Sequence, residues 1–108
     1  MTGKLKKTKK IYWDKNVVES YNSKIKLKWG YVTFYLHKTN KDRWNYEVYW
    51  TDTETGSDNT IEIEKNVDFD DIDSATNYII GIACDYFSDH PMLNKINQNI
   101  SMLEEHFK

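Results

Sequence analysis

Strict alternation of apolar and polar residues over residues 43–51, RWNYEVYWT, constrains the fold of this chain more than any other feature. The apolar side chains occupy every second position, at Trp44, Tyr46, Val48 and Trp50, and polar residues or Tyr49 stand between them. Because successive side chains of a strand point to opposite faces, the pattern predicts a strand with one buried face.

Two further segments predict strands on either side of this one. In residues 25–36 the apolar side chains fall at odd positions before Gly30 and at even positions after it, and they are Ile25, Leu27, Trp29, Val32, Phe34 and Leu36. A one-residue bulge at residues 29–30 restores the phase, so that one strand directs all six inward. Residues 59–67, NTIEIEKNV, predict a third strand with Ile61 and Ile63 inward and Glu62 and Glu64 outward.

Helical signals flank the strands. Residues 14–22 predict a short helix capped by Asp14, with Trp13 and Val18 as a hydrophobic staple. A long helix begins after Asp70 or Asp71, either of which is a good N-cap. Its apolar face is Ile72, Ala75, Ile79, Ile82, Ala83 and Tyr86. Pro91 suits the first turn of a last helix, whose apolar stripe is Ile96, Ile100, Leu103 and Phe107.

The predicted fold class is therefore α+β. It comprises a short N-terminal helix, a three-stranded antiparallel β-meander joined by short turn-rich loops, and two C-terminal helices packed on one sheet face. At 108 residues the chain predicts a single domain over residues 11–108, preceded by a basic flexible arm at residues 1–10 that has five lysines and no acid. The sequence has no apolar run of roughly 20 residues and no secretion signal, so we expect a cytoplasmic protein with no membrane partner.

Charge is divided unevenly along the chain. Residues 1–43 hold twelve basic and three acidic residues, a net charge of +9, whereas residues 44–108 hold three basic and fourteen acidic residues, a net charge of −11. Such asymmetry favours a nucleic acid or a charged protein as partner, because each pole steers association.

Motifs for metal, cofactor or catalytic chemistry are not found in the sequence. His37, His90 and His106 have no cysteine at zinc-like spacing, and the four glycines are isolated, unlike a phosphate-binding loop. The acidic run at residues 68–73, DFDDID, lacks the pattern of a calcium loop and is typical of helix capping. We expect no metal, no cofactor and no enzyme. The sequence leaves one alternative, which is a catalytic triad whose members are distant in sequence and meet only in the folded protein.

Cys84 is expected to be a buried small hydrophobe, with a reactive thiol as the alternative.

The outward side of the predicted sheet carries lysines and tyrosines. It would bind single-stranded nucleic acid by stacking bases on rings and neutralising phosphates, and the candidate residues are Lys24, Lys26, Lys28, Tyr31, Tyr35, Arg43 and Tyr49. Thr33, His37 and Glu47 share this side. The alternative is that tyrosines are simply good strand residues.

Acidic residues dominate residues 47–73, where ten carboxylates stand against Lys65 alone. They are Glu47, Asp52, Glu54, Asp58, Glu62, Glu64, Asp68, Asp70, Asp71 and Asp73. Regularly placed carboxylates can imitate a phosphate backbone and occupy the basic groove of a nucleic-acid enzyme. The alternative is an ordinary solvated face.

In element order, residues 14–88 resemble the double-stranded-RNA-binding domain. That family holds phosphate with lysines at the start of its second helix, where this chain has DDIDS. With the extra terminal helix, the order is similar to that of small phage anti-CRISPR inhibitors, which place acidic residues in the DNA-binding groove of Cas9. The resemblance implies a non-enzymatic inhibitor or modulator of a nucleic-acid-binding protein or enzyme such as Cas9. The alternatives are a direct single-strand binder and a subunit of a larger assembly.

Overall fold

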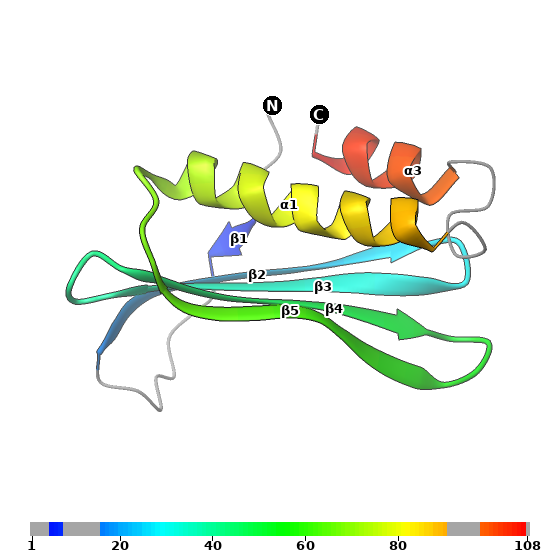
Figure 1. The fold of residues 1–108 in the computed structure, drawn as a ribbon, viewed down its shortest axis with the longest axis horizontal. Coiled ribbons are helices and arrows are strands. Elements are labelled where there is room, and N and C mark those ends of the chain that lie inside the picture. The colour runs from blue at the N-terminus through cyan, green and yellow to red at the C-terminus, as the bar shows by residue number, and fades with distance from the viewer. Residues whose placement is uncertain (1–4, 8–15, 91–97, 108) are drawn as a thin grey trace.

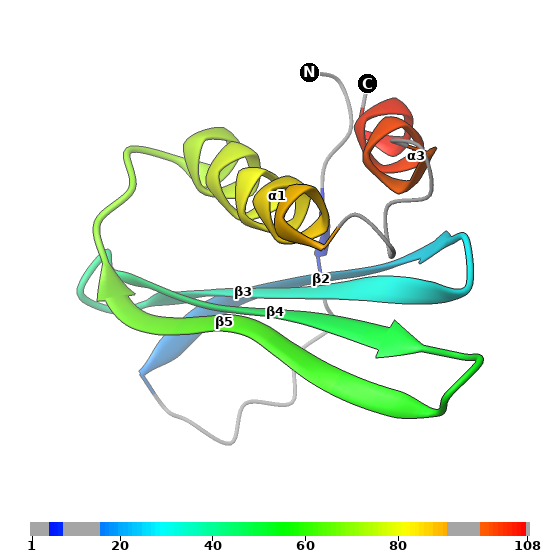
Figure 2. The same ribbon diagram turned by 45° about the vertical axis from the view of Figure 1, so that its right-hand side comes forward.

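The structure, a computed structural model, describes residues 5–7, 16–90 and 98–107, with Lys6 and Lys7 described by their backbone alone. Its sheet runs in the order β1-β2-β3-β4-β5, and every neighbouring pair is antiparallel. Both helices lie over one face of this sheet (Figures 1 and 2), which we call the inner face, and the opposite side is the outer face. The elements are β1 (Lys6–Lys7), β2 (Val17–Leu27), β3 (Gly30–Thr39), β4 (Trp44–Asp52), β5 (Ser57–Val67), α1 (Ile72–Asp89) and α3 (Gln98–His106).

The predicted N-terminal helix and the count of three strands are wrong, because the chain is in a strand from Val17 and the sheet has four long strands. Val17 lies opposite Thr39 in β3, and Tyr21 lies opposite Leu36. The helix was predicted from capping and staple residues that are close in sequence. A strand forms instead because pairing with β3 supplies backbone hydrogen-bond partners along the whole of β2. Trp13 and Asp14, on which those signals depended, lie outside the described residues.

The change of phase around Gly30 comes from a tight turn and not from a bulge. Lys28 and Trp29 form a two-residue connection between β2 and β3, and Leu27 pairs with Gly30 across it. Trp29 has a φ of 69°, a left-handed conformation that is uncommon for a residue with a side chain. The predicted single strand over residues 25–36 is therefore two strands of a hairpin, which reverses the direction of the chain.

Asn99 of α3 holds this turn. The Lys28 N–H donates to Asn99 Oδ1 at 2.8 Å, and Asn99 Nδ2 donates to the Lys28 carbonyl oxygen at 3.3 Å. The side chain of Asn99 is fully buried, so these bonds satisfy an amide that would otherwise be costly to bury. A single polar residue thus joins the last helix to the first hairpin.

Position 30 has no room for a side chain, so glycine is required there. A Cβ atom there would lie 2.1 Å from the Thr51 carbonyl oxygen and 2.6 Å from the Trp50 ring. Thr51 belongs to the neighbouring strand β4, whose backbone is held in the sheet, so it has little room to move.

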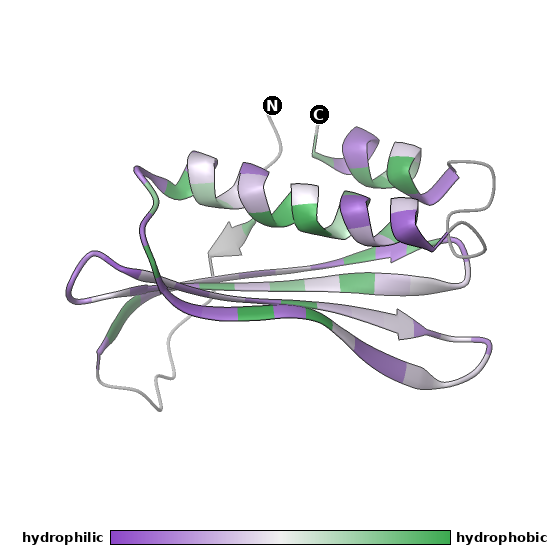
Figure 3. Ribbon diagram, in the orientation of Figure 1, coloured by the Kyte–Doolittle hydropathy of each residue, from purple (hydrophilic) through white to green (hydrophobic). Residues whose placement is uncertain are grey.

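The core lies between the inner face and the two helices, and apolar residues, green in Figure 3, occur on both the strands and the helices. The alternation predicted for β4 is confirmed by the burial of its side chains. The side chains that the three central strands contribute to the hydrophobic core are Ile25, Leu27, Val32, Phe34, Leu36, Trp44, Tyr46, Val48 and Trp50. The helices contribute edge-to-face ring contacts, with centroid distances of 5.2 Å for Trp50 and Phe87 and 5.9 Å for Phe34 and Phe107. Such pairs stabilise the packing beyond the area that they bury.

The buried stripes of the helices differ in part from the prediction. On α1, Ala75, Ile79 and Ala83 are buried as expected, Ile72, Ile82 and Tyr86 are partly buried, and Thr76, Ile80 and Phe87 were missed. Leu103 and Phe107 are buried and Ile100 is partly buried, as predicted for the last helix, but Pro91 and Ile96 lie outside the described residues.

Asp71 is confirmed as the N-cap of α1, since its Oδ1 accepts from the Ser74 N–H at 2.7 Å. That hydrogen bond lowers the pKa of the Asp71 carboxyl.

The predicted facing of the last strand is wrong for Glu62, Ile63 and Glu64, whereas Ile61 is partly buried against the core, as predicted. The register shifts between Val48 and Tyr49, which leaves Ile61 as an extra residue in β5. Glu62 and Glu64 consequently lie opposite Val48 and Tyr46 on the inner face. Ile63 lies opposite Glu47 on the outer face and is 45 % exposed. A bulge inserts one residue and so inverts the alternation beyond it, and a strand at the edge of a sheet tolerates such a bulge.

Candidate functional site

The outer face presents three rows of cross-strand neighbours, because directly paired residues share a face of the sheet. The first row is Lys26, Tyr31, Thr51 and Asp58, the second is Lys24, Thr33, Tyr49 and Thr60, and the third is Asn22, Tyr35, Glu47 and Ile63. Each row begins on β2 and ends on β5. No described helix lies over this face, since α1 and α3 are both on the other side.

A pocket lies against these rows. Its lining includes Lys24 from β2, the three tyrosines Tyr31, Tyr35 and Tyr49, and Asp58 from β5. Four of the strands thus contribute to one depression, which combines a cation, aromatic rings and a carboxylate. The lining is mixed polar and aromatic, unlike that of the apolar core.

Neighbouring groups hold the three tyrosine rings. Tyr35 and Tyr49 pack edge to face, with centroids 6.0 Å apart and planes at 74°. Lys24 Nζ lies 3.8 Å from the centre of the Tyr31 ring, which is a cation–π contact. The Tyr49 hydroxyl donates to Glu47 Oε1. Rings that are already positioned lose little conformational entropy when a planar ligand stacks on them.

The protonation states of this face follow from its hydrogen bonds. The bond to Glu47, with smaller effects of burial and of the Glu47 charge, raises the pKa of Tyr49 to about 12, so its hydroxyl stays a neutral donor at physiological pH. Burial lowers the pKa of His37, and the nearby Glu47 carboxylate opposes this only in part. His37 therefore adds no cation to the outer face at neutral pH.

Ser20, His37 and Glu47 are brought together here, but they do not make an evident catalytic triad. The Ser20 hydroxyl and His37 Nδ1 share a hydrogen bond across β2 and β3. Ser20 is only 5 % exposed, so its oxygen is poorly placed to attack a substrate.

Five of the seven predicted nucleic-acid-binding residues come together, namely Lys24, Lys26, Tyr31, Tyr35 and Tyr49. Lys28 instead lies in the β2–β3 turn held by Asn99. Arg43 lies at the opposite end of the sheet, beside the β3–β4 turn, with its guanidinium 3.9 Å from the Asp68 carboxylate.

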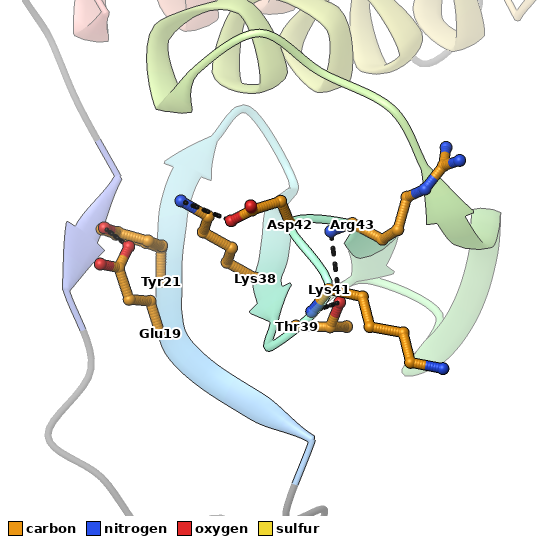
Figure 4. Close-up of polar contacts among 7 residues, drawn as sticks. All are labelled: Glu19, Tyr21, Lys38, Thr39, Lys41, Asp42 and Arg43. Atoms are coloured by element: carbon orange, nitrogen blue, oxygen red, sulfur yellow. Dashed lines mark hydrogen bonds and ion pairs between the residues drawn. The ribbon is translucent and has the colours of Figure 1, made fainter.

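The β3–β4 turn has its own hydrogen bonds, drawn in Figure 4. The Thr39 hydroxyl accepts from the backbone N–H groups of Lys41 and Arg43, at 3.4 and 3.2 Å. Lys38 Nζ lies 3.6 Å from the Asp42 carboxylate, and on β2 the Tyr21 hydroxyl donates to Glu19 at 2.7 Å. These contacts stabilise local structure, and the basic residues at this end are remote from the pocket.

The ten predicted acidic residues are spread over several surfaces. Glu47 and Asp58 belong to the outer face, Asp52 to the end of β4, Glu54 to the β4–β5 turn, and Glu62 and Glu64 to the inner side of β5. Asp68 and Asp70 belong to the loop before α1, and Asp71 and Asp73 to the start of α1. Several have structural tasks. Asp52 accepts from the N–H groups of Glu54 and Thr55, at 2.9 and 3.1 Å, and Glu62 accepts from the hydroxyl of buried Tyr46.

The order of the strands converts the charge asymmetry of the sequence into a charge gradient across the sheet. Because the strands follow one another in sequence order, β2 with Lys24 and Lys26 lies toward one edge of the sheet and the acidic strand β5 lies at the other. Leu5 is buried in the core and Lys6–Lys7 pair with Tyr21 and Asn22, which ties the lysine-rich segment to the basic edge at these residues. The other residues of the predicted arm lie outside the described ones.

A second pocket lies between α1 and α3, and its lining includes Gly81, Cys84, Ser101 and Glu104. Burial, with smaller effects of Glu104 and Asp85, raises the pKa of the Cys84 thiol to about 11. The thiolate, which is the reactive form, is therefore scarce at neutral pH.

Residue patterns did not predict that Asn22 lines the outer-face pocket or that Asn99 holds the β2–β3 turn. Asn22 was assigned to a helix, and a buried asparagine has no distinctive signal in a sequence. Asp58 was predicted only as part of an acidic surface, whereas the structure places it in the row of Tyr31.

No family model matches the sequence, and neither the curated proteins nor the solved structures yielded a match. The two resemblances in element order depended on an N-terminal helix and on three strands, which the structure replaces by four long strands. They therefore support no function. Among the described residues, no group of three or more histidine, cysteine or acidic residues is arranged to hold a metal ion, and neither helix is long and apolar enough to cross a membrane.

Proposed function

We propose that this chain binds a short single-stranded nucleic-acid segment on the outer face. Bases stack on Tyr31, Tyr35 and Tyr49, and Lys24 and Lys26 contact phosphates along β2. The observation that carries the proposal is the gathering of three tyrosines and two lysines on one sheet face that no described helix covers, where the tyrosines and Lys24 line a pocket.

The arrangement suits a nucleic-acid strand that runs along β2. Lys24 and Lys26 are two positions apart on one strand, so their backbones are separated by roughly 6.6–6.8 Å along the chain direction. Phosphates at these lysines direct the bases across β3 and β4, where the tyrosines lie. Stacking tolerates every base, because each has an aromatic face, and it contributes about 1–3 kcal/mol per base. Binding of this kind requires no catalytic step.

The test is the fluorescence anisotropy of a labelled oligonucleotide titrated with the protein at low salt. Tyr31→Ala should weaken binding by about 1–3 kcal/mol, because it removes a stacking ring, whereas Tyr31→Phe keeps the ring and should bind nearly as wild type does. Lys24→Ala should weaken binding and lower its salt dependence. Lys65→Ala is the matched control, because this exposed lysine lies on β5 at the acidic edge. An affinity that is the same for wild type and Tyr31→Ala would reject the stacking site.

A second candidate function rests on the acidic edge. Glu64, Asp70 and Asp73 are exposed along β5 and the start of α1, where the charge gradient is most negative. This surface would bind a cationic groove of a nucleic-acid-handling protein in place of a phosphate backbone.

Competition with DNA for a protein that has a basic nucleic-acid-binding groove tests this second function, and Cas9 serves as the test protein. The wild-type protein should displace target DNA from a Cas9–guide RNA complex, and a variant with Glu64, Asp70 and Asp73 changed to Lys should not. These three residues are preferable to Glu62 and Asp71, which bond Tyr46 and cap α1. Undiminished DNA binding in the presence of wild-type protein would eliminate Cas9 as the partner.

A further inference from the structure

The charge on the outer face changes sign within single rows. The first row begins with Lys26 on β2 and ends with Asp58 on β5, with Tyr31 between them. In the third row Tyr35 lies directly opposite Glu47. A ligand that stacks on either ring therefore has lysines along one side of it and a carboxylate along the other.

Both carboxylates are oriented by hydroxyl donors of the same face. The Thr51 hydroxyl donates to Asp58 Oδ1 at 2.8 Å, and the Tyr49 hydroxyl donates to Glu47 Oε1. These bonds engage one oxygen of each group, and an ionised carboxylate has acceptor positions on both oxygens and no donor. Asp58, which lines the pocket, and Glu47, which lies opposite Tyr35 in the third row, thus offer oriented acceptors to a ligand on the rings.

From this arrangement we infer that the outer face prefers bases that carry an exocyclic amino group, which are adenine, cytosine and guanine, over thymine and uracil. The inference rests on the proposed function and specifies its ligand. Lys24 and Lys26 attract the phosphate chain to β2 and the two carboxylates repel it from β4 and β5, so the base edges project toward Asp58 and Glu47. Amino groups there donate to the carboxylates, as glutamate and aspartate accept from the cytosine amino group in other readout sites.

Thymine and uracil present a carbonyl oxygen where cytosine presents its amino group. The carbonyl oxygen and the carboxylate oxygen are both acceptors, and neither carries a proton. The hydrogen bond is therefore lost, and two negatively charged oxygens lie side by side. A hydrogen bond to a charged group is worth enough for the affinity of a pyrimidine oligonucleotide to fall roughly tenfold between cytosine and thymine. Stacking alone would give no such order, since every base has a ring face.

The experiment compares labelled homo-oligonucleotides of about eight nucleotides by anisotropy, at near-neutral pH and low salt, with adenine, cytosine or thymine in the DNA series and adenine, cytosine or uracil in the RNA series. The cytosine oligonucleotide should bind roughly tenfold more tightly than the thymine one, and likewise relative to uracil. The two series determine whether the backbone is DNA or RNA, because only the sugar and the methyl group differ.

Variants separate base readout from the intrinsic properties of each oligonucleotide. Asp58→Asn and Glu47→Gln replace acceptors by amides that also donate, so together they should raise affinity for thymine and abolish the preference for cytosine. Asp89→Asn is the matched control, because it makes the same change at an exposed site on α1. A preference that persists in the double variant, or equal binding of cytosine and thymine by wild type, would overturn the inference and leave the proposed function intact. Failure to bind any oligonucleotide would overturn both.

Discussion

Replacing Asn99 by leucine should destabilise the fold far more than its place on a short terminal helix suggests. The substitution keeps the volume of the side chain but removes the bonds of 2.8 and 3.3 Å to the Lys28 peptide. Each neutral hydrogen bond contributes about 1 kcal/mol, so we expect a loss of about 2 kcal/mol in the free energy of unfolding. The turn would also lose support for the left-handed conformation of Trp29.

Thermal and urea unfolding monitored by circular dichroism measure this loss. For a domain of this size, 2 kcal/mol corresponds to a decrease in Tm of about 8–16 °C. Gln98→Ala is the matched control, because Gln98 is the exposed neighbour of Asn99 on the same helix, and it should change stability by less than about 0.5 kcal/mol. If Asn99→Leu unfolds within about 0.5 kcal/mol of wild type, the link between α3 and the first hairpin is not what holds the turn.

Three further expectations concern Gly30, Cys84 and Tyr49. Gly30→Ala should cost about 2 kcal/mol or more in urea unfolding, because its Cβ meets the Thr51 backbone, and an unchanged midpoint would contradict this. Cys84, the single thiol, should react with a thiol reagent much more slowly at neutral pH in the native than in the urea-unfolded protein, and equal rates would refute its burial. Because the pKa of Tyr49 is raised to about 12, its contribution to stability is present below about pH 10 and lost as pH rises through 12. Tyr49→Phe should reduce that loss in unfolding measured between pH 9 and about 12, and an identical pH profile would argue against the bond to Glu47.

The residue pattern predicts well wherever packing is regular. The unbroken alternation in β4 identified its four buried side chains, because a period of two leaves only one way to bury tryptophan at positions 44 and 50. The same reasoning placed Tyr31, Tyr35 and Tyr49 together on the outer face. The N-cap of α1 was narrowed to Asp70 or Asp71 because an aspartate before an apolar helix repeat commonly caps the helix, and the structure identifies Asp71.

The failures share a physical cause, which is the dependence of local geometry on a neighbour in space. Residues 17–22 hold polar side chains that obscure the alternation of a strand, and only pairing with β3 shows that they form one. The β2–β3 turn places Trp29, and not glycine, in a left-handed conformation, so it lacks the usual sequence signal of a tight turn. The bulge at Ile61 depends on the register of β5 against β4, which no property of β5 alone determines.

The most direct test of the proposed site is an NMR titration of isotopically labelled protein with a short single-stranded oligonucleotide. Binding on the outer face predicts the largest chemical-shift changes at Lys24, Tyr31, Tyr35 and Tyr49, with little change along α1, because the helices lie on the other side of the sheet. The changes should diminish as salt is added. Shifts confined to β5 and the start of α1, or no shifts at any oligonucleotide concentration, would contradict the assignment of the outer face as the binding site.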